Sequence, residues 1–186
     1  MRRAIFLDRD GTINVEKEYL YRAEEFEFVN GAPQAVRLLN EAGFFVVVVT
    51  NQSGVARGYY SEGDVEALHR HIDRELGKAG ARVDAWFYCP HHLQGNGHYA
   101  LACNCRKPLP GMLLDAAQQF GIDLEASVMI GDKLDDIKAG IAAGCRSILV
   151  RTGYGAADES RVPVGTEVYD NLLEAAQALT RLHGRV

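Results

Sequence analysis

The chain has 186 residues, 47% of them hydrophobic, and a formal net charge of −5 at pH 7. Its length predicts one domain over residues 1–186 with a full core, and its charge argues against nucleic acid or an anionic membrane surface as partner. No apolar run approaches the roughly 18 residues that cross a bilayer, and no signal-peptide core follows Met1. A cytoplasmic protein is therefore expected, in which the four cysteines are thiols or metal ligands.

Strand-like and helix-like segments alternate along the first half of the chain. A short strand is predicted over residues 5–7 and a helix over 33–42, with Pro33 in its first turn. Residues 44–49 are continuously apolar, which is typical of a parallel strand buried on both faces. Ser61 is a good N-cap for a long helix to about residue 79.

The alternation continues to the end of the chain. Strands are predicted over 84–88, 127–130 and 147–150, helices over 112–120 and 134–143, and a packing helix with a tail over 171–186. This order predicts an α/β fold, a three-layer sandwich with a mainly parallel, Rossmann-like sheet and little room for a separate cap domain. Residues 90–111 and 153–166 are long irregular stretches, which are often functional in compact domains.

Polar residues follow the predicted strands at the point where each strand ends. Asp8 and Asp10 follow the first strand, Thr50 follows the second, and Gly131-Asp132 follows a later one. Ligands of open α/β sheets bind at this edge, and extended residues two apart point to the same side. Two carboxylates there can bind a divalent cation, or divide the roles of nucleophile and proton carrier between them.

A second group of residues predicts a structural metal. Cys89 and His91 stand before an 11-residue polar and glycine-rich excursion, and Cys103 and Cys105 stand after it. Three thiolates and one imidazole complete a closed tetrahedral zinc site, so residues 89–105 are predicted to be a zinc-stapled loop. His92 and His98 are alternative ligands. The remaining thiol, Cys145, is expected in the core.

Taken in order, these motifs resemble those of the haloacid dehalogenase superfamily of phosphotransferases. D-x-D-x-T matches Asp8, Asp10 and Thr12, the second-motif hydroxyl matches Thr50, the third-motif lysine matches Lys107, and G-D-x-x-x-D ends at Asp136. The resemblance implies that Asp8 is the nucleophile, Asp10 the general acid and base, and Thr50 and Lys107 the groups that hold the phosphoryl oxygens. It also implies Mg²⁺ at Asp8, the Asp10 carbonyl and Asp132. Asp136, rather than Asp135, is the expected supporting acid.

The zinc loop, with the DRDGTIN and TNQSGVARG segments, resembles the zinc-containing branch of this superfamily. That branch acts on heptose 1,7-bisphosphate or on histidinol phosphate. The resemblance implies release of the phosphate at carbon 7 for the synthesis of nucleotide-activated heptose and lipopolysaccharide core. The expected substrate contacts are Arg9, Glu16, Lys17, Glu18, Tyr19, Asn51, Gln52, Ser53, Arg106 and Lys133.

Alternatives remain open at this point. Arg106 beside Lys107 suits a polyanionic sugar, whereas Glu16 and Glu18 could meet the cationic groups of histidinol phosphate. A phosphoryl-ligand-binding module without turnover is a remote alternative, because the nucleophile, acid and lysine positions are all filled. The chain is expected to be a monomer. His69 and His71 fall in the predicted long helix and are expected on its surface.

Overall fold

The computed structural model describes residues 1–183. Its six-stranded sheet has the order β3-β2-β1-β4-β5-β6, and every neighbouring pair is parallel. The strands are β1 (Ala4–Leu7), β2 (Phe45–Asn51), β3 (Ala85–Cys89), β4 (Val128–Gly131), β5 (Arg146–Val150) and β6 (Glu167–Tyr169).

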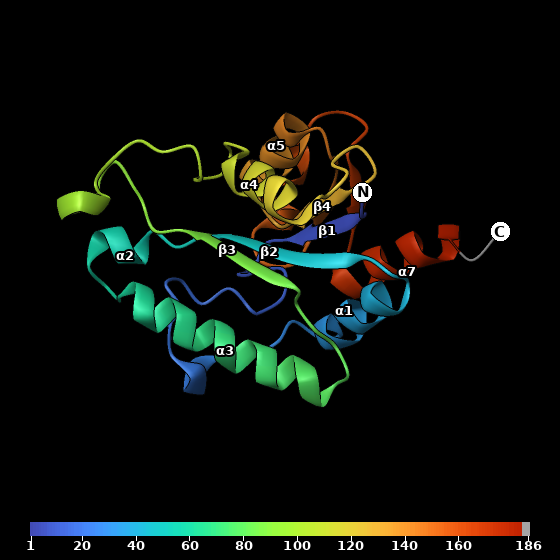
Figure 1. Cartoon of the computed structure of the whole chain (residues 1–186), viewed down its shortest axis with the longest axis horizontal. Coiled ribbons are helices and arrows are strands. Elements are labelled where there is room, and N and C mark those ends of the chain that lie inside the picture. Colours follow the sequence, from blue (N-terminus) through green and yellow to red (C-terminus); the bar gives the residue numbers. More distant parts are fainter. Residues whose placement is uncertain (184–186) are drawn as a thin grey trace.

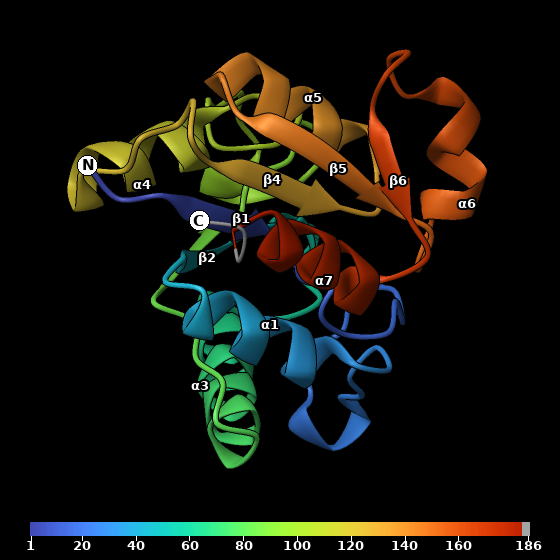
Figure 2. The same cartoon turned by 90° about the vertical axis from the view of Figure 1, so that its right-hand side faces the viewer.

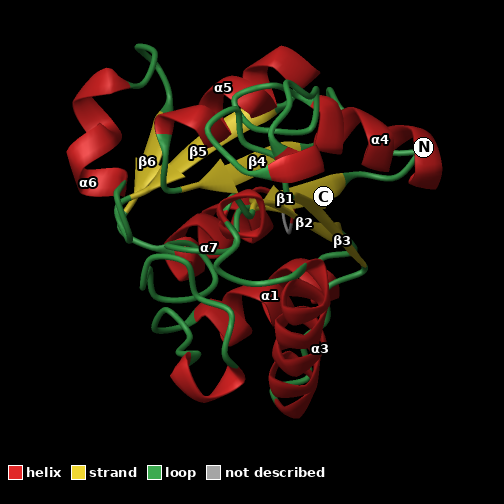
Figure 3. Cartoon of the chain, turned by 90° about the vertical axis from the view of Figure 1, so that its left-hand side faces the viewer, coloured by secondary structure: helices red, strands yellow, loops and turns green. Residues whose placement is uncertain are grey.

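Helices cover both faces of the sheet, which makes three layers (Figures 1 and 2). In Figure 3, α1, α3 and α7 lie on one side of the strands, and α4 and α5 lie on the other. The longer helices are α1 (Ala32–Glu41), α3 (Glu62–Lys78), α4 (Gly111–Phe120), α5 (Leu134–Ala143) and α7 (Leu172–His183). Short helical turns are η1 (Ala23–Glu25), α2 (Gly54–Arg57), η2 (Gly97–Tyr99), α6 (Gly155–Asp158) and η3 (Glu159–Arg161).

The central strands are buried on both faces because successive side chains alternate between the two layers. In β1, Ile5 and Leu7 join the core under α1, α3 and α7, whereas Ala4 and Phe6 join the core under α4 and α5. The predicted α/β sandwich with a parallel sheet is confirmed. Ser61 also caps α3 as predicted, through a reciprocal capping box with Asp64.

The structure differs from the predicted elements in the regions that lack hydrophobic periodicity. The stretch 153–166 holds two short helical turns and leads into β6, an edge strand of three half-buried residues that the sequence pattern did not indicate. Short edge strands carry too few buried residues to show the alternation of a longer strand. The tail expected after the last helix falls on residues 184–186, which lie outside the described residues.

Two long connections bring polar residues to the carboxyl edge of the sheet. Residues 8–31 join β1 to α1, and residues 90–110 join β3 to α4 with only the turn η2 inside them. Within residues 1–183 neither connection builds a separate cap domain. Among the described helices, none has the length and apolar character needed to cross a membrane.

Candidate active site

A polar hollow opens at the carboxyl ends of β1, β2 and β4, where the sequence predicts the site. Its inner part, of about 150 Å³, is lined by Asp8, Asp10, Asn51, Ser53, Arg106, Lys107, Lys133, Asp135 and Asp136. An adjoining outer part of about 290 Å³ is lined by Asp10, Glu16, Glu18, Tyr19, Asn51, Gln52, Ser53, Tyr60, Lys133 and Tyr154. Many of the predicted site residues therefore share one cleft.

Lys107 holds two acids together at the bottom of this cleft. Its Nζ donates to Oδ1 of Asp8 at 2.8 Å and to the Val49 carbonyl at 2.7 Å, and lies 2.6 Å from Oδ1 of Asp136. All three charged side chains are buried. Asp135, in contrast, is exposed. The fold thus brings Asp136, rather than Asp135, against Lys107 and Asp8.

Asp132 is the third buried acid of this cluster, and among the described residues only one of its two carboxylate oxygens has a hydrogen-bond partner. Its Oδ2 accepts from the Tyr154 backbone N–H at 2.9 Å, whereas its Oδ1 is buried with no hydrogen-bond partner among the described residues. Gly11, at φ +84°, and Gly153, at φ +57°, lie so close that a Cβ on either would overlap the Asp132 carboxylate. Glycine at both positions therefore lets this carboxylate enter the site.

The charges at the bottom of the cleft do not balance. Burial and the charges of Asp8 and Asp136 raise the pKa of Asp132 to about 9. Burial and Asp8 likewise raise the pKa of Asp136 to about 6, against the lowering effect of Lys107. Burial would lower the pKa of Lys107, but Asp136 and Asp8 raise it to about 12. The three carboxylates thus outnumber the two ammonium groups that face them, Lys107 and, farther out, Lys133, and a divalent cation would neutralise the excess negative charge.

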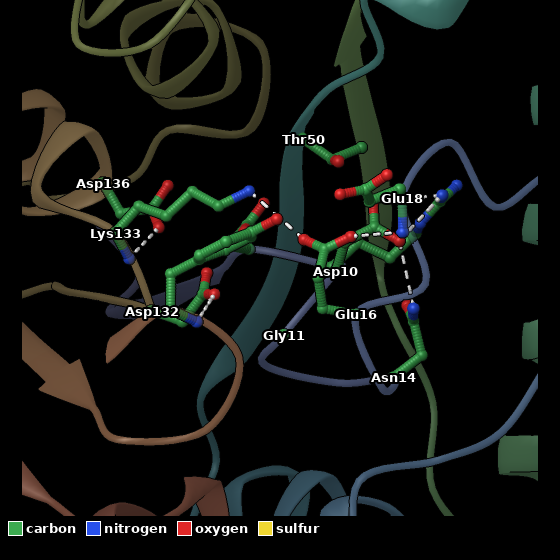
Figure 4. Close-up of polar contacts among 12 residues, drawn as sticks. Asp10, Gly11, Asn14, Glu16, Glu18, Thr50, Asp132, Lys133 and Asp136 are labelled. Atoms are coloured by element: carbon green, nitrogen blue, oxygen red, sulfur yellow. Dashed lines mark hydrogen bonds and ion pairs between the residues drawn. The ribbon is translucent and has the colours of Figure 1, made fainter. Parts of the chain in front are cut away.

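These three acids fit a hard cation. One carboxylate oxygen from each of Asp8, Asp132 and Asp136 lies within 4.8 Å of the others, and carboxylate oxygens are the ligands that Mg²⁺ prefers. The oxygen of Asp132 that has no hydrogen-bond partner among the described residues is free to act as a ligand to this cation. Figure 4 shows Asp132 and Asp136 on one side of the site, with Asp10 facing them across it.

Asp10 is held in place through both of its carboxylate oxygens. Oδ1 accepts from Nδ2 of Asn14 at 3.0 Å (Figure 4) and from Nη2 of Arg9 at 3.1 Å. Oδ2 accepts from Nε2 of Gln52 at 3.0 Å. Burial works to raise the pKa of Asp10, but Arg9, Asn14 and Gln52 together lower it. The carboxylate is therefore fixed in orientation and ionised in the free protein.

Several residues expected to contact substrate also contact other side chains or the backbone. Asn51 donates to and accepts from the Lys107 backbone, at 3.0 Å each, and so ties β2 to the lysine loop. Gln52 is buried; it also donates to the Thr50 hydroxyl at 2.9 Å and accepts from Tyr60 at 2.7 Å. Arg9 is fully buried. Lys17 donates to the Glu25 carbonyl at 2.8 Å, away from the inner cleft.

The side chains at the open end of the cleft are arranged around Lys133. Its Nζ lies 3.2 Å from Oε2 of Glu16 and 4.7 Å from the centre of the Tyr154 ring. Glu18 and Tyr19 adopt left-handed backbone conformations, with φ of 46° and 49°, and line the outer cleft. Ser53 and Arg106 line the inner part. The cleft therefore offers two cations to a ligand, Lys133 at its open end and Arg106 farther inside, together with several hydrogen-bonding groups.

The predicted metal cluster is assembled as expected. The Sγ atoms of Cys89, Cys103 and Cys105 lie 2.9–3.6 Å apart, and Nδ1 of His91 lies 3.4 Å from Sγ of Cys105. All four ligand atoms lie within 4.8 Å of one another, and the cysteines form no disulfide. Three thiols and an imidazole that converge in this way suit a tetrahedral metal.

The two alternative histidine ligands lie outside this cluster. Nδ1 of His92 accepts from the Gln94 backbone at 3.0 Å, and the His98 ring packs on Tyr99 at 4.0 Å between ring centres. Cys145 is buried in the core under α4 and α5, as expected. Arg106, next to the cluster, donates to the His91 carbonyl at 3.4 Å.

Sequence reasoning missed several residues that complete the site. Tyr154 lines the cleft, and Asn14, Tyr60 and Thr152 hold its walls: Thr152 donates to the Gly11 carbonyl at 2.6 Å. The only signal for Tyr154 and Thr152 was their place in or beside the irregular stretch 153–166. His69, expected on the surface, is 5% exposed, because one face of α3 packs it against β3.

The chain is similar to known phosphatases along almost its whole length. Residues 104–175 match the model of the HAD-hydrolase-like family. The chain is 43% identical over 183 residues to D-glycero-beta-D-manno-heptose-1,7-bisphosphate 7-phosphatase of Haemophilus influenzae, covering 98% of this chain and 99% of that protein. It is 44% identical to the protein of the same name from Escherichia coli K12, with 96% and 94% covered. The chain belongs to this phosphatase family.

Solved structures support the same family. The crystal structure of D,D-heptose 1,7-bisphosphate phosphatase from B. bronchiseptica, complexed with magnesium and phosphate, has a TM-score of 0.89 and 37% identity, with 97% of this chain and 99% of that chain covered. The corresponding enzyme from Burkholderia thailandensis has a TM-score of 0.73 and 33% identity, with 96% and 98% covered. As a member of this heptose bisphosphate phosphatase family, the chain is a phosphoric monoester hydrolase.

Proposed function

We propose that the chain removes the 7-phosphate of D-glycero-β-D-manno-heptose 1,7-bisphosphate through a phosphorylated Asp8. The observation that carries this proposal is the near-complete alignment with phosphatases named for this substrate. The buried cluster of Asp8, Lys107, Asp132 and Asp136 supports the chemistry, because it combines a carboxylate nucleophile with a lysine and a place for a cation.

Asp8 and Asp10 divide the chemistry between them. Asp8 attacks phosphorus, and the bond to the sugar oxygen breaks as Asp8 becomes an aspartyl phosphate. Asp10, ionised in the free protein, takes up a proton from solvent as the anionic substrate binds, gives it to the departing alkoxide, and later takes one from the water that hydrolyses the intermediate. The three hydrogen bonds that fix the Asp10 carboxylate support this role, because proton transfer needs a defined geometry.

Positive charge and hydrogen-bond donors hold the transferring phosphoryl group. Lys107 and Thr50 contact its oxygens in this proposal, and their burial strengthens those contacts. Asp8, Asp132 and the Asp10 carbonyl, with Asp136 in support, would hold Mg²⁺, whose charge would let an anionic nucleophile meet an anionic phosphate.

The second metal is proposed to be a structural zinc at Cys89, His91, Cys103 and Cys105. The four converging donors support it, and they leave no ligand position for substrate. Because Arg106 and Lys107 follow Cys105 directly, a metal at this point would hold the loop that places both cations.

Substrate recognition is proposed to depend on the short loops around the cleft. Glu16, Glu18, Tyr19 and Ser53 offer groups to the sugar hydroxyls, and Arg106 and Lys133 offer cations to the second phosphate. Asn51 and Gln52 line the cleft and remain proposed substrate contacts. Arg9 and Lys17, which were also expected to contact substrate, act in this proposal by holding the walls of the site.

The test is release of phosphate from purified protein in Mg²⁺. The β and α anomers of the heptose bisphosphate are compared with histidinol phosphate, and Asp8→Asn serves as the blank. We expect kcat/KM to be highest for the β anomer. A preference for histidinol phosphate would overturn the substrate assignment, and more than a few per cent of wild-type activity in Asp8→Asn would remove Asp8 as nucleophile.

We also propose that the enzyme acts as a monomer in the cytoplasm. The four cysteines form no disulfide, which is typical of a protein in a reducing compartment. Sedimentation of the purified protein in reducing buffer checks the monomer, and a dimer at micromolar concentration would contradict it.

A further inference from the structure

Arg9 and His69 form a contact under the active site that the chemistry described above does not use. Nη1 of Arg9 lies 3.3 Å from Nε2 of His69, although the two residues are 60 positions apart. Both side chains are buried: Arg9 is 0% exposed and His69 is 5% exposed. A charged guanidinium is costly to bury unless its donors are matched by acceptors, so the partners of Arg9 are informative.

The contact determines the form of the imidazole. Arginine carries donors and no acceptor, so Nε2 of His69 must present its lone pair and the ring proton must sit on Nδ1. A protonated ring would place a second cation against Arg9. Burial, followed by the charge of Arg9, agrees with a neutral ring, since together they lower the pKa of His69 to about 3.

His69 is itself held in place by aromatic neighbours. Its ring stacks on Trp86 with 4.2 Å between ring centres and an interplanar angle of 19°, and Tyr88 approaches edge-on at 6.0 Å. Trp86 is anchored through Nε1, which donates to Asp73 at 3.0 Å. The His69 ring, which accepts from Arg9, is therefore fixed on α3 by its packing against β3.

Arg9 connects this fixed histidine to Asp10 in the active site. Its Nη2 donates to Oδ1 of Asp10 at 3.1 Å and to the Leu20 carbonyl at 2.9 Å, beside the loop that lines the outer cleft. Its Nε has no hydrogen-bond partner among the described residues, so the two terminal nitrogens alone orient the guanidinium. Because the fork is rigid, fixing Nη1 on His69 also fixes the direction of Nη2.

We propose that His69 is a positioning residue for the phosphatase reaction: as a neutral acceptor it orients Arg9, and through Arg9 it orients the Asp10 carboxylate toward the leaving oxygen. The inference rests on the proposed function of Asp10 as the acid that protonates the sugar alkoxide. Loss of this proton donation would slow the reaction most for a substrate with a poor leaving group, because a good leaving group departs without a proton.

The kinetic test compares three variants with two substrates. His69→Leu removes the acceptor and keeps an apolar body against Trp86, whereas His69→Gln places an amide oxygen near the position of Nε2. His71→Leu is the matched control, since His71 lies on the same helix, is half-buried and contacts Phe26 rather than Arg9. The substrates are the heptose bisphosphate and p-nitrophenyl phosphate, whose nitrophenolate needs no proton.

For His69→Leu we expect kcat with the heptose bisphosphate to fall about tenfold or more at nearly unchanged KM, since acid catalysis contributes about 10² to 10⁴ in rate. Its kcat/KM with p-nitrophenyl phosphate should change little, His69→Gln should recover most of the loss, and His71→Leu should match the wild type. Equal losses with both substrates would reduce His69 to a folding role, and no loss would overturn the inference. A wild type that fails on the heptose bisphosphate would instead count against the proposed function.

A second measurement does not depend on activity. Imidazole ¹⁵N shifts of the labelled protein, assigned by the signals missing from His69→Leu, report which ring nitrogen carries the proton. We expect the Nδ1–H form of His69, unchanged between pH 5 and 8. A proton on Nε2, or a ring that becomes charged in this range, would overturn the inference.

Discussion

The Lys107 ammonium lies 2.8 Å from the Asp8 carboxylate although the two residues stand 99 positions apart in the chain. Asp8 follows the central strand β1, and Lys107 comes from the loop between β3 and α4. This loop reaches the middle of the sheet because Asn51 holds the Lys107 backbone at the end of β2. The pair is thus a product of the parallel sheet, which gathers its strand ends at one edge.

Replacing Lys107 by Met should affect both catalysis and stability. The loss of one group that stabilises the transition state should lower kcat about 10²- to 10³-fold. Two buried acids would also lose their partner, so the free energy of unfolding should fall by about 3–5 kcal/mol in the absence of Mg²⁺. Steady-state kinetics and urea unfolding measure these effects. Lys138→Met, at an exposed position on α5, should change neither.

The Cys89/His91/Cys103/Cys105 cluster should hold about one zinc per chain by elemental analysis. The variant Cys103→Ser/Cys105→Ser should lose this metal, and its kcat should fall because Arg106 and Lys107 are no longer held. Cys145→Ala, whose thiol lies in the core, should keep the zinc. A metal-free wild type of full stability would contradict the structural role.

The free energy of unfolding should depend on pH, and Mg²⁺ should counteract this dependence. Asp132 and Asp136 have pKa values of about 9 and about 6 in the fold against 3.8 for the ordinary side chain, so the folded state binds more protons than the unfolded state between these values. Without Mg²⁺ the free energy of unfolding should therefore decrease as the pH rises from about 5 to 9.

Mg²⁺ requires ionised carboxylates, so the increase in Tm that it produces should grow over the same pH range. Thermal unfolding with and without Mg²⁺ checks both trends, in buffers without a chelator that would remove zinc. Asp132→Asn removes the main titrating group and should weaken both. An Mg²⁺ effect that is independent of pH would contradict this account.

Gly11 should not tolerate a side chain. Gly11→Ala would place a Cβ against the Asp132 carboxylate at a backbone φ of +84°, so both stability and Mg²⁺-dependent activity should fall. The control is Gly77→Ala, which lies within α3 with open space around it and should stabilise the helix by about 0.5–1 kcal/mol. Unchanged kinetics in Gly11→Ala would argue against a fixed Asp132.

Local patterns were sufficient for most of the architecture. The continuous apolar run of β2 and the cap at Ser61 indicate a buried parallel strand and a helix start, because both depend on neighbouring residues alone. The same holds for Asp8 and Asp10, whose spacing puts them on one side of an extended chain, and for the Cys-x-His and Cys-x-Cys pairs of the metal loop.

Only the tertiary structure decided what each polar side chain meets. From the sequence Arg9 was expected to contact substrate and His69 to lie on the surface of its helix, yet the fold brings the two side chains together under the site. Gln52, Asn51 and Tyr154 likewise gain their partners from distant segments. The sequence by itself determined the strands, the helices and the chemical groups, since these follow from local periodicity and residue type. Burial, charge balance and orientation arose from long-range packing, which no local pattern encodes.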